Sequence, residues 1–153
     1  MPTQLIASPS VSQDRNDLAE PIKKHGWVGV DLDGTAALYD HWRGPTHIGH
    51  PVPLMVERIK KWIREGQEVR IFTARVFPFF YRSDEEIDLD LVNENTLDQS
   101  EAALAIQSWC FKYVGQKLAI TCAKDMSMIQ LWDDRAVQVV QNAGIRADGL
   151  PTL

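Results

Sequence analysis

The sequence lacks the features that mark several large classes of protein. It has only two cysteines, Cys110 and Cys122, without Cys-x-x-Cys spacing or a secretory context, so we expect free, buried thiols instead of a disulfide. No apolar run approaches the roughly 18 residues of a membrane span. No basic region followed by an apolar run indicates a signal peptide. We therefore expect a cytoplasmic protein without a membrane partner.

Positive charge is not in excess, and no internal repeat is evident. The chain of 153 residues carries a net charge of -5. Because broad, sequence-independent binding to nucleic acid needs many Lys and Arg side chains facing the phosphates, this balance argues against it. It remains compatible with an enzyme that holds a single phosphate. The composition, 44% hydrophobic and 24% charged, and the length are typical of one globular domain.

The ends of that domain follow from composition. Residues 1–21 are rich in Ser, Pro, Gln, Asn and Asp, with Leu5-Ile6 as a single short apolar pair. Such segments bury too little apolar surface to order themselves, so we expect a flexible N-terminal tail. We expect residues 22–153 to form a single domain.

Strands and helices are expected to alternate along the domain. Val28 and Val30 predict a short buried strand that ends at Asp31, and apolar residues at steps of three and four predict a helix from Pro53 to about Gly66. A β-branched and aromatic run predicts a strand over 68–75. Further segments are a helix from Ser100 to Gly115, strands over 117–122 and 127–134, and a short helix over 136–142. This order predicts an α/β fold with a mainly parallel sheet.

Polar side chains stand at or just after the ends of the predicted strands. They are Asp31, Asp33, Thr73, Lys124, Asp133 and Asp134. Because ligand crevices of parallel sheets lie beyond the carboxyl ends of the strands, we expect these groups to converge. Neighbouring carboxylates repel one another and need a proton or a cation between them, and Mg2+ is the common cation at phosphate sites. Such a set suits phosphoryl transfer.

The same residues resemble the motifs of the haloacid dehalogenase-like superfamily. Asp-Leu-Asp-Gly-Thr at 31–35 is similar to motif one, Asp-x-Asp-x-Thr, and Ile-Phe-Thr-Ala-Arg at 71–75 is similar to motif two. Leu-Trp-Asp-Asp-Arg at 131–135 resembles the acidic motif four, and Lys124 matches the lysine of motif three. The resemblance covers residues 27 to about 144. It implies a three-layer α/β/α, Rossmann-like fold.

The resemblance also implies roles for single residues. Asp31 would be the nucleophile and a Mg2+ ligand, and Asp33 would be the general acid/base that reaches the metal through its backbone carbonyl. Thr73 and Lys124 would bind the phosphoryl group, and Asp133 would complete the metal site. The implied activity is a Mg2+-dependent phosphomonoester hydrolase with an aspartyl-phosphate intermediate.

Some assignments within this scheme stay open. Asp134 would either bind the metal through water or accept a hydrogen bond from Lys124. Lys117 competes for the lysine role, although it precedes its strand. Asp33 disfavours dehalogenation, because dehalogenase members lack an acid at that position.

The segments after motifs one and two are too short for a full cap domain. Residues 36–52 form a predicted flap, and residues 76–97 are either a solvated acidic loop or a small lid. The chain therefore resembles a capless member, which works with an open cleft or borrows a neighbouring subunit in a homo-oligomer. The expected substrate is a phosphorylated small metabolite or nucleotide.

Alternatives remain for the substrate and for the flap. The run from Gly44-Pro45 to Arg75 resembles phosphatase halves of polynucleotide end-processing enzymes, so a nucleic-acid 3'-phosphate end is the second substrate class. A non-catalytic phosphate-binding or regulatory protein is the competing function. The flap histidines lack zinc-site spacing. Trp42 could pack or stack on substrate, and Arg75 and Arg135 could bind substrate or pair with local acids.

Overall fold

The computed structural model describes residues 24–76 and 101–151. The elements in these residues are β1 (Trp27–Asp31), α1 (Pro53–Arg64), β2 (Glu68–Phe72), the 3-10 helix η1 (Ala74–Val76), α3 (Glu101–Tyr113), β3 (Ala119–Thr121) and β4 (Met128–Trp132). The predicted tail over 1–21 lies outside the described residues, as does the predicted loop over 76–97 beyond its first residue. The alternation of strands and helices makes this a small α/β fold, as predicted.

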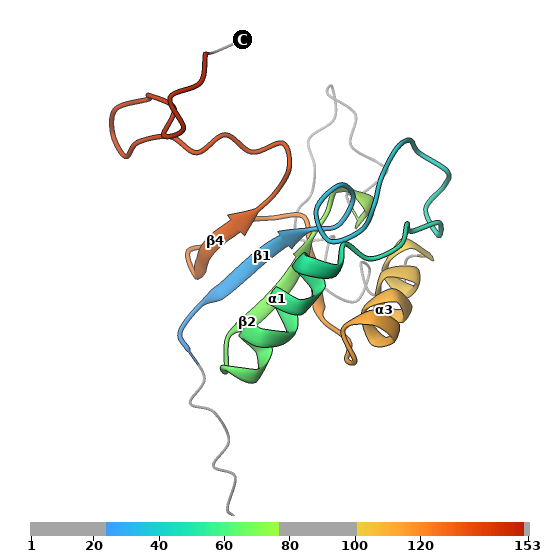
Figure 1. The fold of residues 1–153 in the computed structure, drawn as a ribbon. Helices are drawn as coiled ribbons and strands as arrows, with labels where there is room; N and C mark the ends of the chain where they lie inside the picture. The colour runs from blue at the N-terminus through green and yellow to red at the C-terminus, as the bar shows by residue number, and fades with distance from the viewer. Residues whose placement is uncertain (1–23, 77–100, 152–153) are drawn as a thin grey trace, which may run out of the picture.

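The four strands form one sheet in the order β3-β2-β1-β4, and every neighbouring pair is parallel (Figure 1). Asp31 at the end of β1 pairs with Phe72 at the end of β2, and Phe72 pairs with Thr121 at the end of β3. On the other side of β1, Val30 pairs with Trp132, the last residue of β4. The carboxyl ends of all four strands therefore lie at one edge, which confirms the predicted parallel arrangement.

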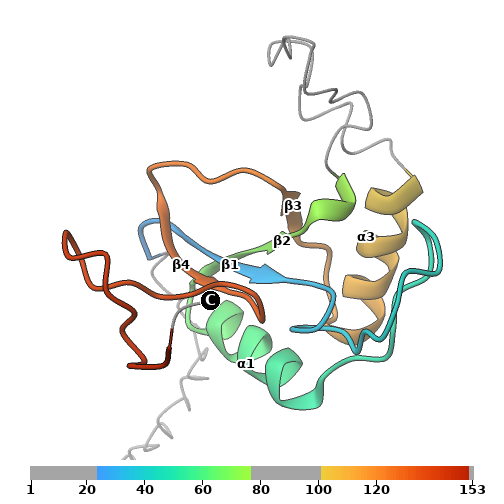
Figure 2. The ribbon, with the colours of Figure 1, turned by 90° about the horizontal axis from the view of Figure 1, so that it is seen from above.

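Both helices pack on the same face of the sheet (Figure 2). Alternate residues of β1 and β2 point to this face and share one hydrophobic core with the apolar faces of the helices. The central members of that core are Val28, Val30, Val69, Ile71, Met55, Val56, Ile59, Ile106, Trp109 and Cys110. Pro53 suits the first turn of α1, and Lys61 and Arg64 in its last turn complement the helix dipole.

The opposite face of the sheet is crossed by the segment between β3 and β4. Trp27, which is fully buried, donates a hydrogen bond from Nε1 to Oδ1 of Asp125 at 2.8 Å. The guanidinium of Arg70 lies 4.6 Å from the centre of the Trp27 ring. In residues 24–76 and 101–151 no helix covers this face, and the helices and sheet form two layers.

The predicted helix over residues 136–142 is wrong. The chain there is extended and turns back on itself, with a bridge between Val139 and Arg146 and a hydrogen bond from Val140 N to Ile145 O at 2.8 Å. Val139 and Val140 are 56% and 48% exposed, so no apolar face is buried to stabilise a helix. The strands predicted over 68–75, 117–122 and 127–134 are also shorter in the structure.

Two smaller expectations concern the cysteines and the membrane. Cys110 and Cys122 are both free; Cys110 is buried, as predicted, and Cys122 is partly exposed. Burial raises the pKa of the Cys110 thiol to about 12, which keeps it protonated at neutral pH. In the part of the chain that the structure describes, no helix has the length and apolar character needed to cross a membrane.

Candidate functional site

The sheet has a topological switch point between β1 and β4. The chain runs from β1 to β2 to β3 on one side and then returns to place β4 on the other side of β1. In open parallel sheets this reversal point, at the carboxyl ends of the strands, is where a ligand crevice forms. Asp31 is the last residue of β1, and Asp133 and Asp134 directly follow β4, so all three lie at this point.

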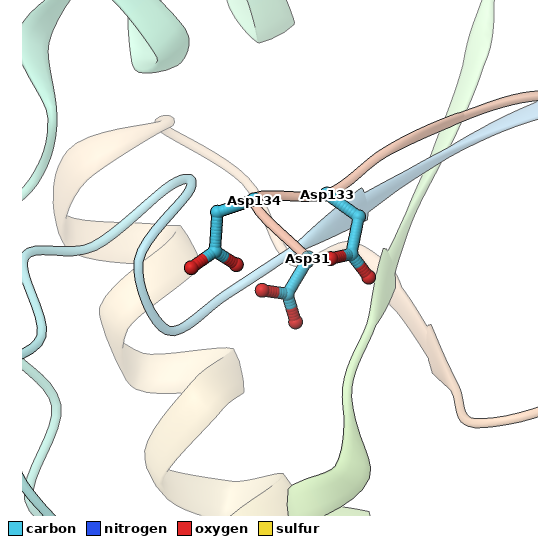
Figure 3. Close-up of side chains that lie close together, drawn as sticks. All are labelled: Asp31, Asp133 and Asp134. Carbon is cyan, nitrogen blue, oxygen red and sulfur yellow. The ribbon is translucent and has the colours of Figure 1, made fainter. Parts of the chain in front are cut away.

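Together these three aspartates form a cluster of carboxylates, named here the acid cluster. One carboxylate oxygen from each of Asp31, Asp133 and Asp134 lies within 4.8 Å of the other two. Figure 3 shows their side chains projecting to the same side of the two strand ends. Asp31 and Asp133 are half-buried and Asp134 is exposed. Three carboxylate oxygens this close together could hold a metal ion.

The acid cluster changes the ionisation of Asp31. Burial, the charge of Asp133 and a hydrogen bond with Asp134 together raise the pKa of Asp31 from its ordinary value of 3.8 to about 7. A hydrogen bond from the backbone of Leu32 acts in the opposite direction but is outweighed. The cluster therefore favours the protonated form of Asp31, and a cation would favour release of this proton.

The Gly-Thr pair of the first motif brings the loops after β1 and β4 together. Gly34 has a φ of +90°, and a Cβ built on it would lie 2.5 Å from Oδ2 of Asp134, so a larger residue would displace this acid. Thr35 Oγ1 accepts a hydrogen bond from the backbone N of Asp134 at 3.1 Å. Sequence reasoning did not select Thr35, although its place in the motif was a usable signal.

Asp33 does not join the acid cluster but forms an ion pair with Arg75. Nε and Nη2 of Arg75 donate to the two carboxylate oxygens of Asp33 at 2.6 and 2.7 Å. The Arg75 side chain is 4% exposed and that of Asp33 is 19% exposed, so the pair is largely shielded from water. The sequence left two roles open for Arg75, substrate binding and pairing with a local acid, and in the structure Arg75 pairs with Asp33.

Arg75 also holds the flap, residues 36–52. Its Nη1 donates to the carbonyl oxygens of Gly44 at 3.3 Å and Pro45 at 3.0 Å, and its guanidinium lies 4.8 Å from the centre of the Trp42 ring. The two ends of the flap are joined by a hydrogen bond from Val52 N to Ala36 O at 2.8 Å. One buried cation therefore links the flap to the first motif.

A cleft of about 460 Å³ opens at this edge of the sheet. Its walls are Asp31, Asp33, Asp133, Thr73, Tyr39, Trp42, Phe72, Ala74, Arg75 and Arg135. Of the predicted site residues, the structure thus brings together Asp31, Asp33, Thr73 and Asp133. Thr73 is buried, and its Oγ1 accepts a hydrogen bond from Arg75 N at 3.2 Å.

Lys124 is not among the residues that line the cleft. It is exposed and lies on the segment between β3 and β4. The alternative, Lys117, is exposed before the start of β3, at the opposite end of that strand from the cleft edge. The assignment of Lys124 to the phosphoryl group stays a prediction.

Sequence reasoning missed the aromatic walls formed by Tyr39 and Phe72. For Phe72 the sequence contained a signal. Strand residues alternate between faces, so Phe72 points away from the core side that Ile71 occupies, and it directly precedes the predicted site residue Thr73. Tyr39 lies in a segment without periodicity, where no local pattern predicts where a side chain points. Both rings were therefore absent from the predicted site.

Comparisons of the chain with protein-family models, with curated proteins and with solved structures found no match.

Proposed function

We propose that this protein is a Mg2+-dependent phosphomonoester hydrolase that acts on a phosphorylated small metabolite or nucleotide. The observation that carries the proposal is the convergence of Asp31, Asp133 and Thr73 at the reversal point of a parallel sheet. The resemblance to the haloacid dehalogenase-like superfamily supports the same chemistry. On the basis of this resemblance, we also propose that the protein has the three-layer fold of that superfamily and lacks a cap domain.

The acid cluster offers the donor set that a hard cation requires. Mg2+ prefers oxygen ligands and is commonly held by one or two carboxylates together with water and substrate. Asp31 and Asp133 would bind it directly, with the backbone carbonyl of Asp33, and Asp134 would contribute through water. The raised pKa of Asp31 supports this assignment, because burial and the charges of Asp133 and Asp134 oppose its ionisation, and a bound cation would favour the ionised form. When bound, Mg2+ would neutralise the charge that develops on the phosphoryl group.

The protein side chains would carry the two chemical steps. The Asp31 carboxylate attacks phosphorus, the bond to the ester oxygen breaks, and Asp33 donates a proton to the leaving alkoxide. Asp33 then takes a proton from water, and the water oxygen attacks the phosphorus of the Asp31 phosphate. The bond between phosphorus and Asp31 breaks, which releases inorganic phosphate and restores the Asp31 carboxylate and the protonated Asp33. The Thr73 hydroxyl would donate a hydrogen bond to a non-bridging oxygen. To donate in the first step, Asp33 has to carry a proton, so at least one of its oxygens has to leave Arg75 and be protonated before the substrate reacts.

The proposal is tested by hydrolysis of an aryl phosphate with Mg2+, with EDTA, and with EDTA followed by excess Mg2+. We expect turnover only when Mg2+ is present, because the carboxylates of the cleft repel an anionic substrate without it. A panel of sugar phosphates, nucleotides and 3'-phosphorylated oligonucleotides then identifies the substrate class. A folded protein that binds Mg2+ or phosphate but hydrolyses none of these compounds would instead be a binding protein.

Metal binding should also be visible without turnover, as a pH-dependent gain in thermal stability. The folded pKa of Asp31 lies above its unfolded value, so its ionisation costs stability as pH rises from about 4 through about 7. Mg2+ binds the ionised form and offsets that cost. We therefore expect Mg2+ at about ten times its Kd to raise Tm by about 3 °C or more at pH 8, and by less at pH 5.5.

The measurement is thermal unfolding at both pH values with Mg2+ or with NaCl of equal ionic strength. Asp133→Asn removes one proposed ligand and should reduce the shift. The same shift with NaCl, or an equal shift at both pH values, would argue against a metal at these acids.

A further inference from the structure

One wall of the cleft is aromatic and partly open to solvent. Trp42 is 52% exposed and Tyr39 is 39% exposed, and Phe72 at the end of β2 is half-buried. All three line the cleft that contains Asp31 and Asp133. Exposed apolar rings in a concave surface beside polar groups are typical of a ligand site.

Trp42 differs from the other tryptophans of the described residues. Trp27 and Trp109 are buried, and Trp62 and Trp132 pack against each other with ring centres 5.2 Å apart. These four rings have structural partners that account for their position. Trp42 is the tryptophan that remains exposed while facing the cleft.

The Trp42 ring is nevertheless held in place. The Arg75 guanidinium lies 4.8 Å from the ring centre, and Asp33 and two flap carbonyls fix that guanidinium through hydrogen bonds. A ring that is already held loses little conformational freedom when a ligand binds to it. Arg75 thus makes Trp42 a preformed surface for a flat ligand.

We propose that Trp42, together with Tyr39 and Phe72, forms a stacking subsite for the base of a nucleoside monophosphate. The inference rests on the proposed phosphatase function and narrows its substrate class: the phosphate would lie at Asp31 and Asp133, and the base against the aromatic wall. Bases stack on aromatic side chains with little dependence on sequence, because every base has a π face. A cleft of about 460 Å³ lies within the range of small-molecule sites.

The charges around the cleft favour a mononucleotide over a polynucleotide end. A polynucleotide backbone needs several cations along its path. Among the described residues two cations line the cleft, and Arg75 is already paired with Asp33, which leaves Arg135 as the exposed cation of this lining. One phosphate and one base match this arrangement.

The test compares a nucleoside 5'-monophosphate with ribose 5-phosphate, which has the same sugar and phosphate but no base. We expect a higher kcat/KM for the nucleotide, and Trp42→Ala should lower the ratio of the two values by about 5- to 100-fold. Trp42→Phe should retain most of the ratio, because it keeps a π face. Phe111→Ala is the control, since Phe111 is 64% exposed on α3 and does not line the cleft.

A binding measurement separates this inference from the phosphatase proposal. In the Asp31→Asn protein with Mg2+, titration calorimetry should give a tighter Kd for the nucleotide than for ribose 5-phosphate, and Trp42→Ala should remove the difference. Equal kcat/KM for both compounds, or an equal loss on both in Trp42→Ala, would overturn the subsite even if hydrolysis occurs. Preference for 3'-phosphorylated oligonucleotides over mononucleotides would overturn the substrate class. Absence of all hydrolysis would instead count against the phosphatase.

Discussion

Replacement of Asp31 by Asn should reduce Mg2+-dependent hydrolysis of an aryl phosphate by more than about a thousandfold. An amide of the same size cannot attack phosphorus, so the covalent step is lost while the packing around it is kept. The variant should fold at least as stably as the wild type without metal, because it removes a carboxyl whose ionisation is opposed by burial and by Asp133 and Asp134. Initial rates and thermal unfolding of the two proteins measure both effects.

The control for this experiment is Asp148→Asn. Asp148 is an exposed aspartate on the C-terminal segment that pairs with Arg146 and does not line the cleft. Its replacement should leave the hydrolysis rate within about twofold of the wild type. Substantial activity in Asp31→Asn, with the Asp148 variant unchanged, would show that Asp31 is not the nucleophile.

Replacement of Arg75 by Ala should reduce the stability of the protein by about 3 kcal/mol, the lower end of the range for breaking a buried ion pair. The lower end applies because the Asp33 side chain is 19% exposed and recovers some hydration when its partner is lost. The change also removes the donors to Gly44 and Pro45 and the contact with Trp42, which together hold the flap. Urea unfolding should therefore show a lower midpoint concentration. Turnover should also fall, because Arg75 no longer holds Asp33 and the flap in position.

Arg146→Ala is a matched control for Arg75→Ala. Arg146 forms the same two-point contact with Asp148, at 2.9 and 2.7 Å, but its partner is 45% exposed. A surface pair of this kind contributes about 1 kcal/mol or less. Arg75→Lys keeps the positive charge but not the planar guanidinium with its two parallel donors, so it should give an intermediate loss of stability. Equal midpoints for the Arg75 and Arg146 variants would contradict the structural role of Arg75.

The sequence by itself determined the parts of this protein that depend on local periodicity. Alternating Val28 and Val30 predict a strand with one face in the core, and the three-residue step from Val56 to Ile59 predicts residues of the buried face of α1. Leu54 belongs to the same predicted pattern but is 70% exposed in the structure. Once strands and helices alternate, parallel pairing places every strand end at the same edge. The convergence of Asp31, Asp133 and Thr73 therefore followed from the sequence alone.

Only the tertiary structure decided what the irregular segments do. Arg75 and Asp33 are 42 residues apart, and nothing in the local sequence indicates that these two pair while Asp31 joins Asp134. The same holds for Tyr39, whose ring reaches the cleft from a segment without periodicity. Residues 136–142 have a helix-like pattern but bury no face, so packing and not propensity decided their conformation. A periodic pattern indicates which residues contact the core. Contacts between loops have no such pattern, because they form only when the fold brings the loops together.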